Sequence, residues 1–209
     1  FLRSLRWRLI LRPIYKLPVG IAFMIFMNGL LINYLIPVRA GELAKSLVLK
    51  TKYQIRISNS LPTIFIDKIM DLFPILLIMI LIPLISIHLN SALFLIVLIL
   101  FLVFLFFLGF LFFAVNHKKI AVKFLHSFLK IIPRKSRHIF EEFFFDFVEG
   151  MAIMQHRNKD TVFISLLTIL AVLSEATYIF AVFKAFGTHI GFVKILFGYT
   201  LMNLTYILP

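Results

Sequence analysis

Long apolar runs are the feature that most constrains the fold of this 209-residue chain. Hydrophobic residues make up 62% of the chain, and 26 residues are Phe, whereas soluble domains are usually about 45–50% apolar. Several runs approach or exceed the roughly 18–20 residues that a helix needs to cross a bilayer. The sequence therefore predicts an all-α fold, a polytopic transmembrane helix bundle.

The apolar runs also predict where the chain crosses the membrane. We expect four crossings, near 72–88, 91–115, 161–183 and 190–208. The whole chain, 1–209, is expected to form a single transmembrane domain. Because it begins with Phe1 and ends inside an apolar run, we expect it to be a fragment of a longer protein.

The distribution of Lys and Arg predicts the orientation. Basic residues are concentrated in the connections 38–71 and 116–160, and the turns near 88–91 and 184–190 hold few. Loops rich in Lys and Arg usually stay in the cytoplasm, so both long connections are expected there. This topology predicts a multi-pass protein of the cell membrane. It also accounts for the net charge of +13, so no nucleic-acid partner is expected.

The run at 18–37 fits this orientation poorly, and two alternatives remain open. If it spans the membrane, the basic and aromatic segment 1–17, which we expect at the membrane surface, lies outside against the charge rule. The alternative is a re-entrant helix that returns to the cytoplasmic side. Within 116–160, amphipathic helices are expected at 118–155, on the cytoplasmic membrane surface.

A polar segment directly follows this first run. It contains Asn33, Pro37, Arg39, Gly41 and Glu42. Pro37 ends the helical run, and Gly41 gives the backbone freedom at the turn. Charges close to hydrocarbon are costly and usually functional, so we expect this segment to contribute to a binding site.

A short helix is expected to follow at 41–50. Glu42 lies in its first turn, where an acid complements the helix dipole. Lys45 follows at i+3 and can pair with Glu42. A capped helix at the membrane surface explains both residues without a ligand, but it does not explain Arg39 beside Pro37.

Two acids precede the next apolar run. Asp67 and Asp71 stand at i and i+4, on one helix face, where like charges repel. We therefore expect a cation against them, namely Arg39, Lys68 or a ligand cation. The alternative is that both acids only mark the surface end of a helix. The distance between Arg39 and Asp71 is the first structural test.

One more acid, Glu175, lies in the middle of the run 161–183. An acid at this depth costs at least about 2.5 kcal/mol on insertion scales, so it should face the bundle interior or a wet cavity. A role in proton or cation passage and a structural hydrogen bond between helices are equally compatible with its position.

The sequence lacks the residues of most catalytic and metal sites. There is no Cys, which excludes thiolate chemistry, and the His residues are scattered without zinc spacing. No glycine-rich phosphate loop, nucleotide motif or catalytic triad is present. We expect no cofactor, no metal site and no enzymatic activity in this chain.

The two polar motifs resemble those of a known family. Asn33, Pro37, Arg39, Gly41 and Glu42, followed by Asp67, Lys68 and Asp71, resemble the flippase-like membrane domain of lysylphosphatidylglycerol synthetase/flippase proteins. The resemblance covers roughly residues 15–209. The family more often has Glu-Arg-x-x-Asp where this chain has Asp67 to Asp71, and Arg where it has Lys45. A later family motif would begin near 206–209.

The resemblance implies that the chain moves or binds a lipid with a charged head group across the cytoplasmic membrane. The partners would be a phospholipid or lipid-linked substrate and the membrane. Arg39 and Lys45 would contact the phosphate, and Glu42, Asp67 and Asp71 would hold those cations or meet a cationic head group, with Glu175 along the pathway. Two alternatives are the membrane part of an enzyme acting on lipid-linked substrates, such as a glycosyltransferase, and a non-catalytic lipid-binding scaffold.

Overall fold

The computed structural model is all-helical within the residues that it describes, which are 1–36, 40–85, 90–117, 144–145, 147–148 and 158–207. These residues contain seven complete helices and no strand. The helices are α1 (Leu2–Leu11), α2 (Val19–Leu35), α3 (Gly41–Tyr53), α4 (Ile57–Ile85), α5 (Ser91–Asn116), α8 (Asn158–Ala185) and α9 (Phe192–Ile207).

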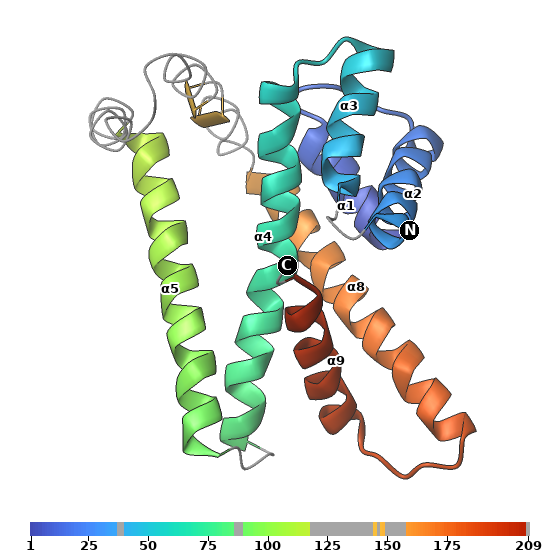
Figure 1. Ribbon diagram of the computed structural model, residues 1–209, viewed down its shortest axis with the longest axis vertical. Helices are drawn as coiled ribbons and strands as arrows, with labels where there is room; N and C mark the ends of the chain where they lie inside the picture. The colour runs from blue at the N-terminus through green and yellow to red at the C-terminus, as the bar shows by residue number, and fades with distance from the viewer. Residues whose placement is uncertain (37–39, 86–89, 118–143, 146, 149–157, 208–209) are drawn as a thin grey trace.

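Four long or apolar helices form one half of the molecule. Figure 1 shows α4, α5, α8 and α9 extending together toward one end, with α4 next to α5, α8 and α9. The helical runs expected near 72–88, 91–115, 161–183 and 190–208 correspond to these helices. The proline residues inside α4, at 62, 74 and 83, do not interrupt it.

One helix in the described residues, Asp160–Ala185, is long and apolar enough by length and composition to cross a membrane. Shorter apolar helical stretches lie at Val19–Leu35 and Phe94–Phe110.

The first three helices form the other half. Helices α2 and α3 run in opposite directions side by side, and α1 packs against α2, α4 and α8 (Figure 1). The rings of Tyr15 and Tyr53 are 5.4 Å apart between centroids. The chain therefore enters α2 and leaves α3 at neighbouring points, as a hairpin does.

Local sequence explains the ends of these helices. Ile36 is extended (φ −113°, ψ 119°) and ends α2, because a residue that precedes proline is disfavoured in the helical region. Helix α3 has Glu42 in its first turn and Lys50 and Lys52 in its last, which complements its dipole. It ends at Gln54, the one described non-glycine residue with a positive φ, 58°, a common helix-ending conformation.

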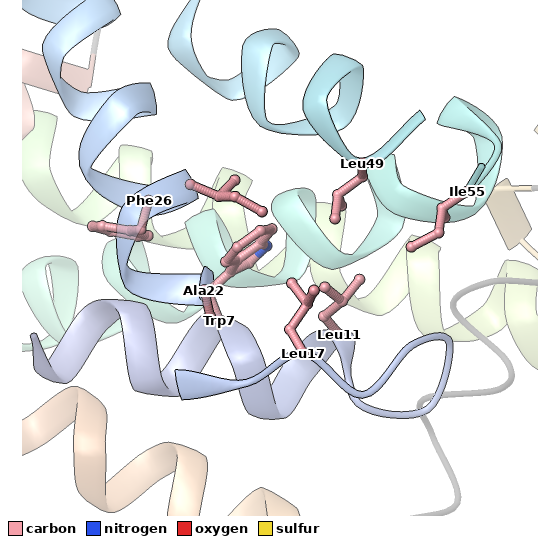
Figure 2. Packing of buried hydrophobic residues seen from close by; sticks show 8 residues of the cluster. Trp7, Leu11, Leu17, Ala22, Phe26, Leu49 and Ile55 are labelled. Carbon is pink, nitrogen blue, oxygen red and sulfur yellow. The ribbon is translucent and has the colours of Figure 1, made fainter. Parts of the chain in front are cut away.

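A hydrophobic cluster joins α1, α2 and α3. Figure 2 shows Trp7 at its centre, between side chains of α2 and α3. The cluster consists of Trp7, Leu11, Leu17, Ala22, Ile25, Phe26, Leu49 and Ile55. These side chains pack against one another between the three helices, so this cluster fixes α1 against the hairpin.

One expectation about this half is wrong. The prediction of a membrane-surface segment at 1–17 fails for α1, because Arg6 is 1% exposed and Trp7 is fully buried in protein. In the same half, Ser60 lies inside α4, which begins at Ile57. Its hydroxyl donates a hydrogen bond to Ser46 Oγ at 2.9 Å and so joins α4 to α3.

Candidate functional site

Arg6 of α1 is the buried centre of a charged site. Its Nε donates to Asp67 Oδ1 at 2.8 Å, and its Nη2 donates to Asp71 Oδ1 at 2.7 Å. Nη1 donates to Thr168 Oγ1 at 3.2 Å, and Nη2 also reaches the carbonyl oxygen of Asp67. One guanidinium thus connects α1, α4 and α8, and it separates two like-charged carboxylates on one helix face.

Arg3, one helical turn earlier, extends the site toward α8 and α9. Its Nη2 donates to Glu175 Oε2 at 2.8 Å, and its Nη1 lies 3.6 Å from Asp71 Oδ2. The Tyr199 hydroxyl donates a hydrogen bond to the same oxygen of Glu175. We call Arg3, Arg6, Asp67, Asp71 and Glu175 the arginine group.

Glu42 of α3 centres a second set of charges. Lys45 Nζ lies 2.8 Å from Glu42 Oε2, and Lys68 Nζ of α4 lies 2.6 Å from Glu42 Oε1. The Lys45 ammonium also lies 4.2 Å from the centroid of the Phe26 ring, a cation–π distance. We call these three charged residues, Glu42, Lys45 and Lys68, the lysine group.

The ionisation of the lysine group follows from these contacts. Burial opposes the charged form of Glu42, but Lys45 and Lys68 outweigh it and hold the pKa of Glu42 below its ordinary value. Burial likewise opposes the charged form of Lys68, but Glu42 outweighs it and raises the pKa of Lys68. Both residues are therefore charged at neutral pH.

The two groups are balanced in charge. Among the described residues they bring together four acids and four cations, and each acid has a cation within 4 Å. An unpaired buried charge costs several kcal/mol, so this balance allows the charges to lie inside the protein. Exposure differs within the site, since the side chain of Arg6 is 1% exposed, that of Glu175 41% and that of Lys68 47%.

The structure brings most of the predicted site residues together. Glu42, Lys45, Asp67, Lys68, Asp71 and Glu175 all lie in these groups. The pairing of Glu42 with Lys45 is confirmed. Asp67 and Asp71 do have cations against them, as expected.

Asn33 and Gly41 have a structural role at the crossing of α2 and α3. The Asn33 side chain accepts a hydrogen bond from the Gly41 backbone N–H at 2.8 Å, and so holds the start of α3 from within α2. This contact explains a polar residue inside an apolar run. Pro37 and Arg39 lie outside the described residues. The predicted proximity of Arg39 and Asp71 therefore stays a prediction. Most of the segment 118–155, where amphipathic helices are expected, also lies outside the described residues.

The cations that pair with the two aspartates are Arg3 and Arg6, which were not among the predicted partners Arg39 and Lys68. Arg6 is 61 residues away from Asp67 along the chain, farther than either predicted partner. One signal was available. Arg3 and Arg6 stand at i and i+3, so a helix places them on one face, matching the shared face of Asp67 and Asp71.

The arrangement is suited to binding charged groups. In the described residues no group of three or more His, Cys, Asp or Glu could hold a metal ion. The arginine group offers hydrogen-bond donors and carboxylates where α1, α4, α8 and α9 meet. Such a set can hold the charged groups of a ligand, or hold the helices in one arrangement.

Comparison with known proteins supplies the membrane context. The family model described as "Lysylphosphatidylglycerol synthase TM region" matches residues 1–209, the whole chain. No curated protein and no solved structure matches the chain. The family match, together with the apolar helices, identifies a membrane protein related to lipid handling. The chain belongs to the lysylphosphatidylglycerol synthase transmembrane-region family.

Proposed function

We propose that the chain is a multi-pass domain of the cell membrane that binds a lipid with a charged head group and moves it between leaflets. The ligand class is a phospholipid or a lipid-linked substrate. The observation that carries the proposal is the charge-balanced site formed by the arginine and lysine groups, at the meeting point of α1, α3, α4 and α8.

The physical argument concerns the cost of moving a charged head group. A charge that enters hydrocarbon alone costs several kcal/mol, and fixed protein charges can replace part of its hydration. Glu175 and Lys68 are the most exposed members of the site. They would meet the head group first, while Arg6 and Lys45 hold the carboxylates in place.

The proposed topology treats α2 and α3 as a re-entrant hairpin, and it places connection 116–160 and the part of connection 38–71 that follows α3 in the cytoplasm. The contact between Tyr15 and Tyr53 supports this, because both ends of the hairpin then lie on one side. Irregular backbone at membrane depth is tolerated where protein buries it, and α1 and α4 pack against this hairpin.

A leaflet assay tests the transport function. The protein, reconstituted in vesicles that contain a fluorescent phospholipid, should speed transfer of that lipid between leaflets relative to protein-free vesicles. Asp71→Asn removes one acid from the site and should slow transfer by about tenfold or more, because Arg3 and Arg6 then compete for fewer acceptors.

Arg12→Gln is the matched control. Arg12 also connects α1 to α8, through a 3.8 Å contact with Asp160, but its side chain is 45% exposed. This variant should transfer lipid at close to the wild-type rate. A wild-type protein that binds phospholipid without moving it would contradict transport and favour a lipid-binding scaffold.

A further inference from the structure

The two arginines of α1 differ sharply in how well their hydrogen bonds are satisfied. All three nitrogens of the Arg6 guanidinium donate to acceptors, and its side chain is 1% exposed. Arg3 uses Nη2 for both Glu175 and the Tyr199 oxygen, and its side chain is 24% exposed. Arg6 is therefore a fixed anchor, whereas Arg3 keeps unused bonding capacity.

The unused hydrogen-bonding capacity of Arg3 lies on its Nε and Nη1 atoms. Arg3 Nε is buried and has no hydrogen-bond partner among the described residues. Its Nη1 is 3.6 Å from Asp71 Oδ2, too long for a hydrogen bond. Buried donors are nearly always paired, and an exception calls for an explanation. Both donor edges of a guanidinium include Nη2, so once Nη2 leaves Glu175 it can act together with Nε or with Nη1 and give an anion two parallel hydrogen bonds.

The resting partner of Arg3 can be exchanged at low cost. Glu175 is 41% exposed, so it can be solvated without Arg3, and the Tyr199 hydroxyl still donates to it. Asp71 keeps its 2.7 Å contact with Arg6 when Arg3 turns away. Releasing Arg3 leaves neither carboxylate buried without a donor.

We propose that Arg3 is an anion-binding residue, which takes the phosphate ester of a lipid head group in exchange for Glu175. The inference rests on the proposed lipid function and names the cation that contacts the phosphate. Lys45 is less suited, because its side chain is 2% exposed and its ammonium is held between Glu42 and the ring of Phe26. The exchange breaks the contact of Arg3 with Glu175 of α8, while the hydrogen bond from Arg6 to Thr168 keeps α1 joined to α8.

Binding of a soluble short-chain phospholipid tests this inference. Purified protein in a neutral detergent is titrated with dihexanoyl phosphatidylglycerol, with dihexanoylglycerol, which lacks the phosphate, and with inorganic phosphate. Arg3→Gln should weaken binding of the phospholipid by about tenfold or more, since a charge-assisted bond is lost. Arg12→Gln, at the C-terminal cap of the same helix, should stay within about twofold.

The Glu175→Gln variant separates the exchange from a purely structural role of Glu175, because the two cases predict different directions of change in phospholipid affinity. Gln keeps an acceptor for the Tyr199 hydroxyl but removes the charge that competes for Arg3. Phospholipid affinity should therefore rise, by about threefold or more. If Glu175 only supports the fold, the same change lowers affinity or leaves it unchanged, and either result overturns the exchange.

Arg3→Lys covers the case in which Arg3→Gln does not fold. It keeps the charge without the planar fork, so its affinity should fall between those of the wild type and a neutral variant, and wild-type affinity would overturn the role of the fork.

Binding of dihexanoylglycerol as tight as that of the phospholipid would overturn the phosphate contact. Equal, Arg3-dependent binding of inorganic phosphate would overturn the lipid source.

The outcome is separate from that of the leaflet assay. A wild-type protein that fails to move lipid, yet shows this order of affinities, contradicts transport and leaves the Arg3 contact standing. A protein that moves lipid while Arg3→Gln binds it normally contradicts the Arg3 contact alone.

Discussion

At the scale of single residues, Arg6 shows how a charge can be stabilising inside an apolar protein. It is almost fully buried, yet two carboxylates, a carbonyl oxygen and a hydroxyl surround it. A buried ion pair adds little over apolar packing, but removing one partner strands the other. The contribution of Arg6 to stability is therefore the cost of leaving Asp67 and Asp71 buried without its hydrogen bonds.

Arg6→Met should lower the free energy of unfolding by about 3–5 kcal/mol, because it leaves two buried carboxylates with too few donors. Thermal unfolding of the purified protein in detergent measures the change. The double variant Arg6→Met with Asp67→Asn should recover part of the loss. Arg12→Gln should cost less than about 1 kcal/mol. Equal losses of unfolding free energy from Arg6→Met and Arg12→Gln would show that the buried network stabilises the fold no more than an exposed ion pair does.

The sequence predicted the need for such a cation but not its identity. Two acids at i and i+4 before an apolar run imply a nearby positive charge. Nothing in the local pattern selects a residue 61 or 65 positions away. Arg3 and Arg6 also resemble the head-group cations of a surface helix, and only tertiary packing tells the two cases apart.

At the scale of elements, the α2–α3 hairpin depends on a close backbone approach. A Cβ placed on Gly41 would overlap the carbonyl oxygen of Gly29 and lie 2.6 Å from Asn33 Oδ1. Backbone atoms at the crossing cannot move aside as a flexible side chain can. The sequence explained Gly41 by turn freedom, whereas the structure adds a steric reason that depends on two helices.

Gly41→Ala should therefore destabilise the protein by about 1–3 kcal/mol, the usual cost of overpacking. Gly20→Ala is the matched control in α2, because a Cβ there meets no atom within 4 Å. It should be neutral or slightly stabilising, since alanine favours the helix. The unfolding temperatures of both variants, measured under the same conditions, test this expectation. Similar values would contradict a tight crossing of α2 and α3 at Gly41.

At the scale of the whole molecule, the antiparallel packing of α2 and α3 bears on the proposed topology. A helix of 17 residues is about 25 Å long, and α3 leads the chain back beside it. Under the proposed topology, a hairpin that enters and leaves the membrane on one side would remove the conflict between the run 18–37 and the basic residues before it.

Single cysteines can map this topology, because the chain has none of its own. Lys16→Cys and Lys52→Cys should react with an impermeant maleimide from the cytoplasmic side, and Phe186→Cys, in the opposite turn, only from outside. Tyr34→Cys, at the far end of α2, should not react from outside. Outside labelling at position 34 would show a spanning helix instead.

Sequence reasoning reached much of the fold and part of the site. Apolar runs give helices, and their ends agree closely for α5, α8 and α9. Acids in apolar surroundings led to the prediction of Glu42, Asp71 and Glu175 as site residues, and the structure places all three in the two charged groups. What it could not reach is the position of α1, because a short basic helix with one Trp carries no sign of the helices that will cover it.

The connections made by α1 also have a consequence for biogenesis. Arg3 and Arg6 are made first, but their partners follow 61 to 196 residues later along the chain. During synthesis, which proceeds from the N-terminus, these two cations therefore remain without these partners until α4, α8 and α9 have been made. The site can close only after α9 has emerged, so its completion marks the end of assembly of this part of the protein.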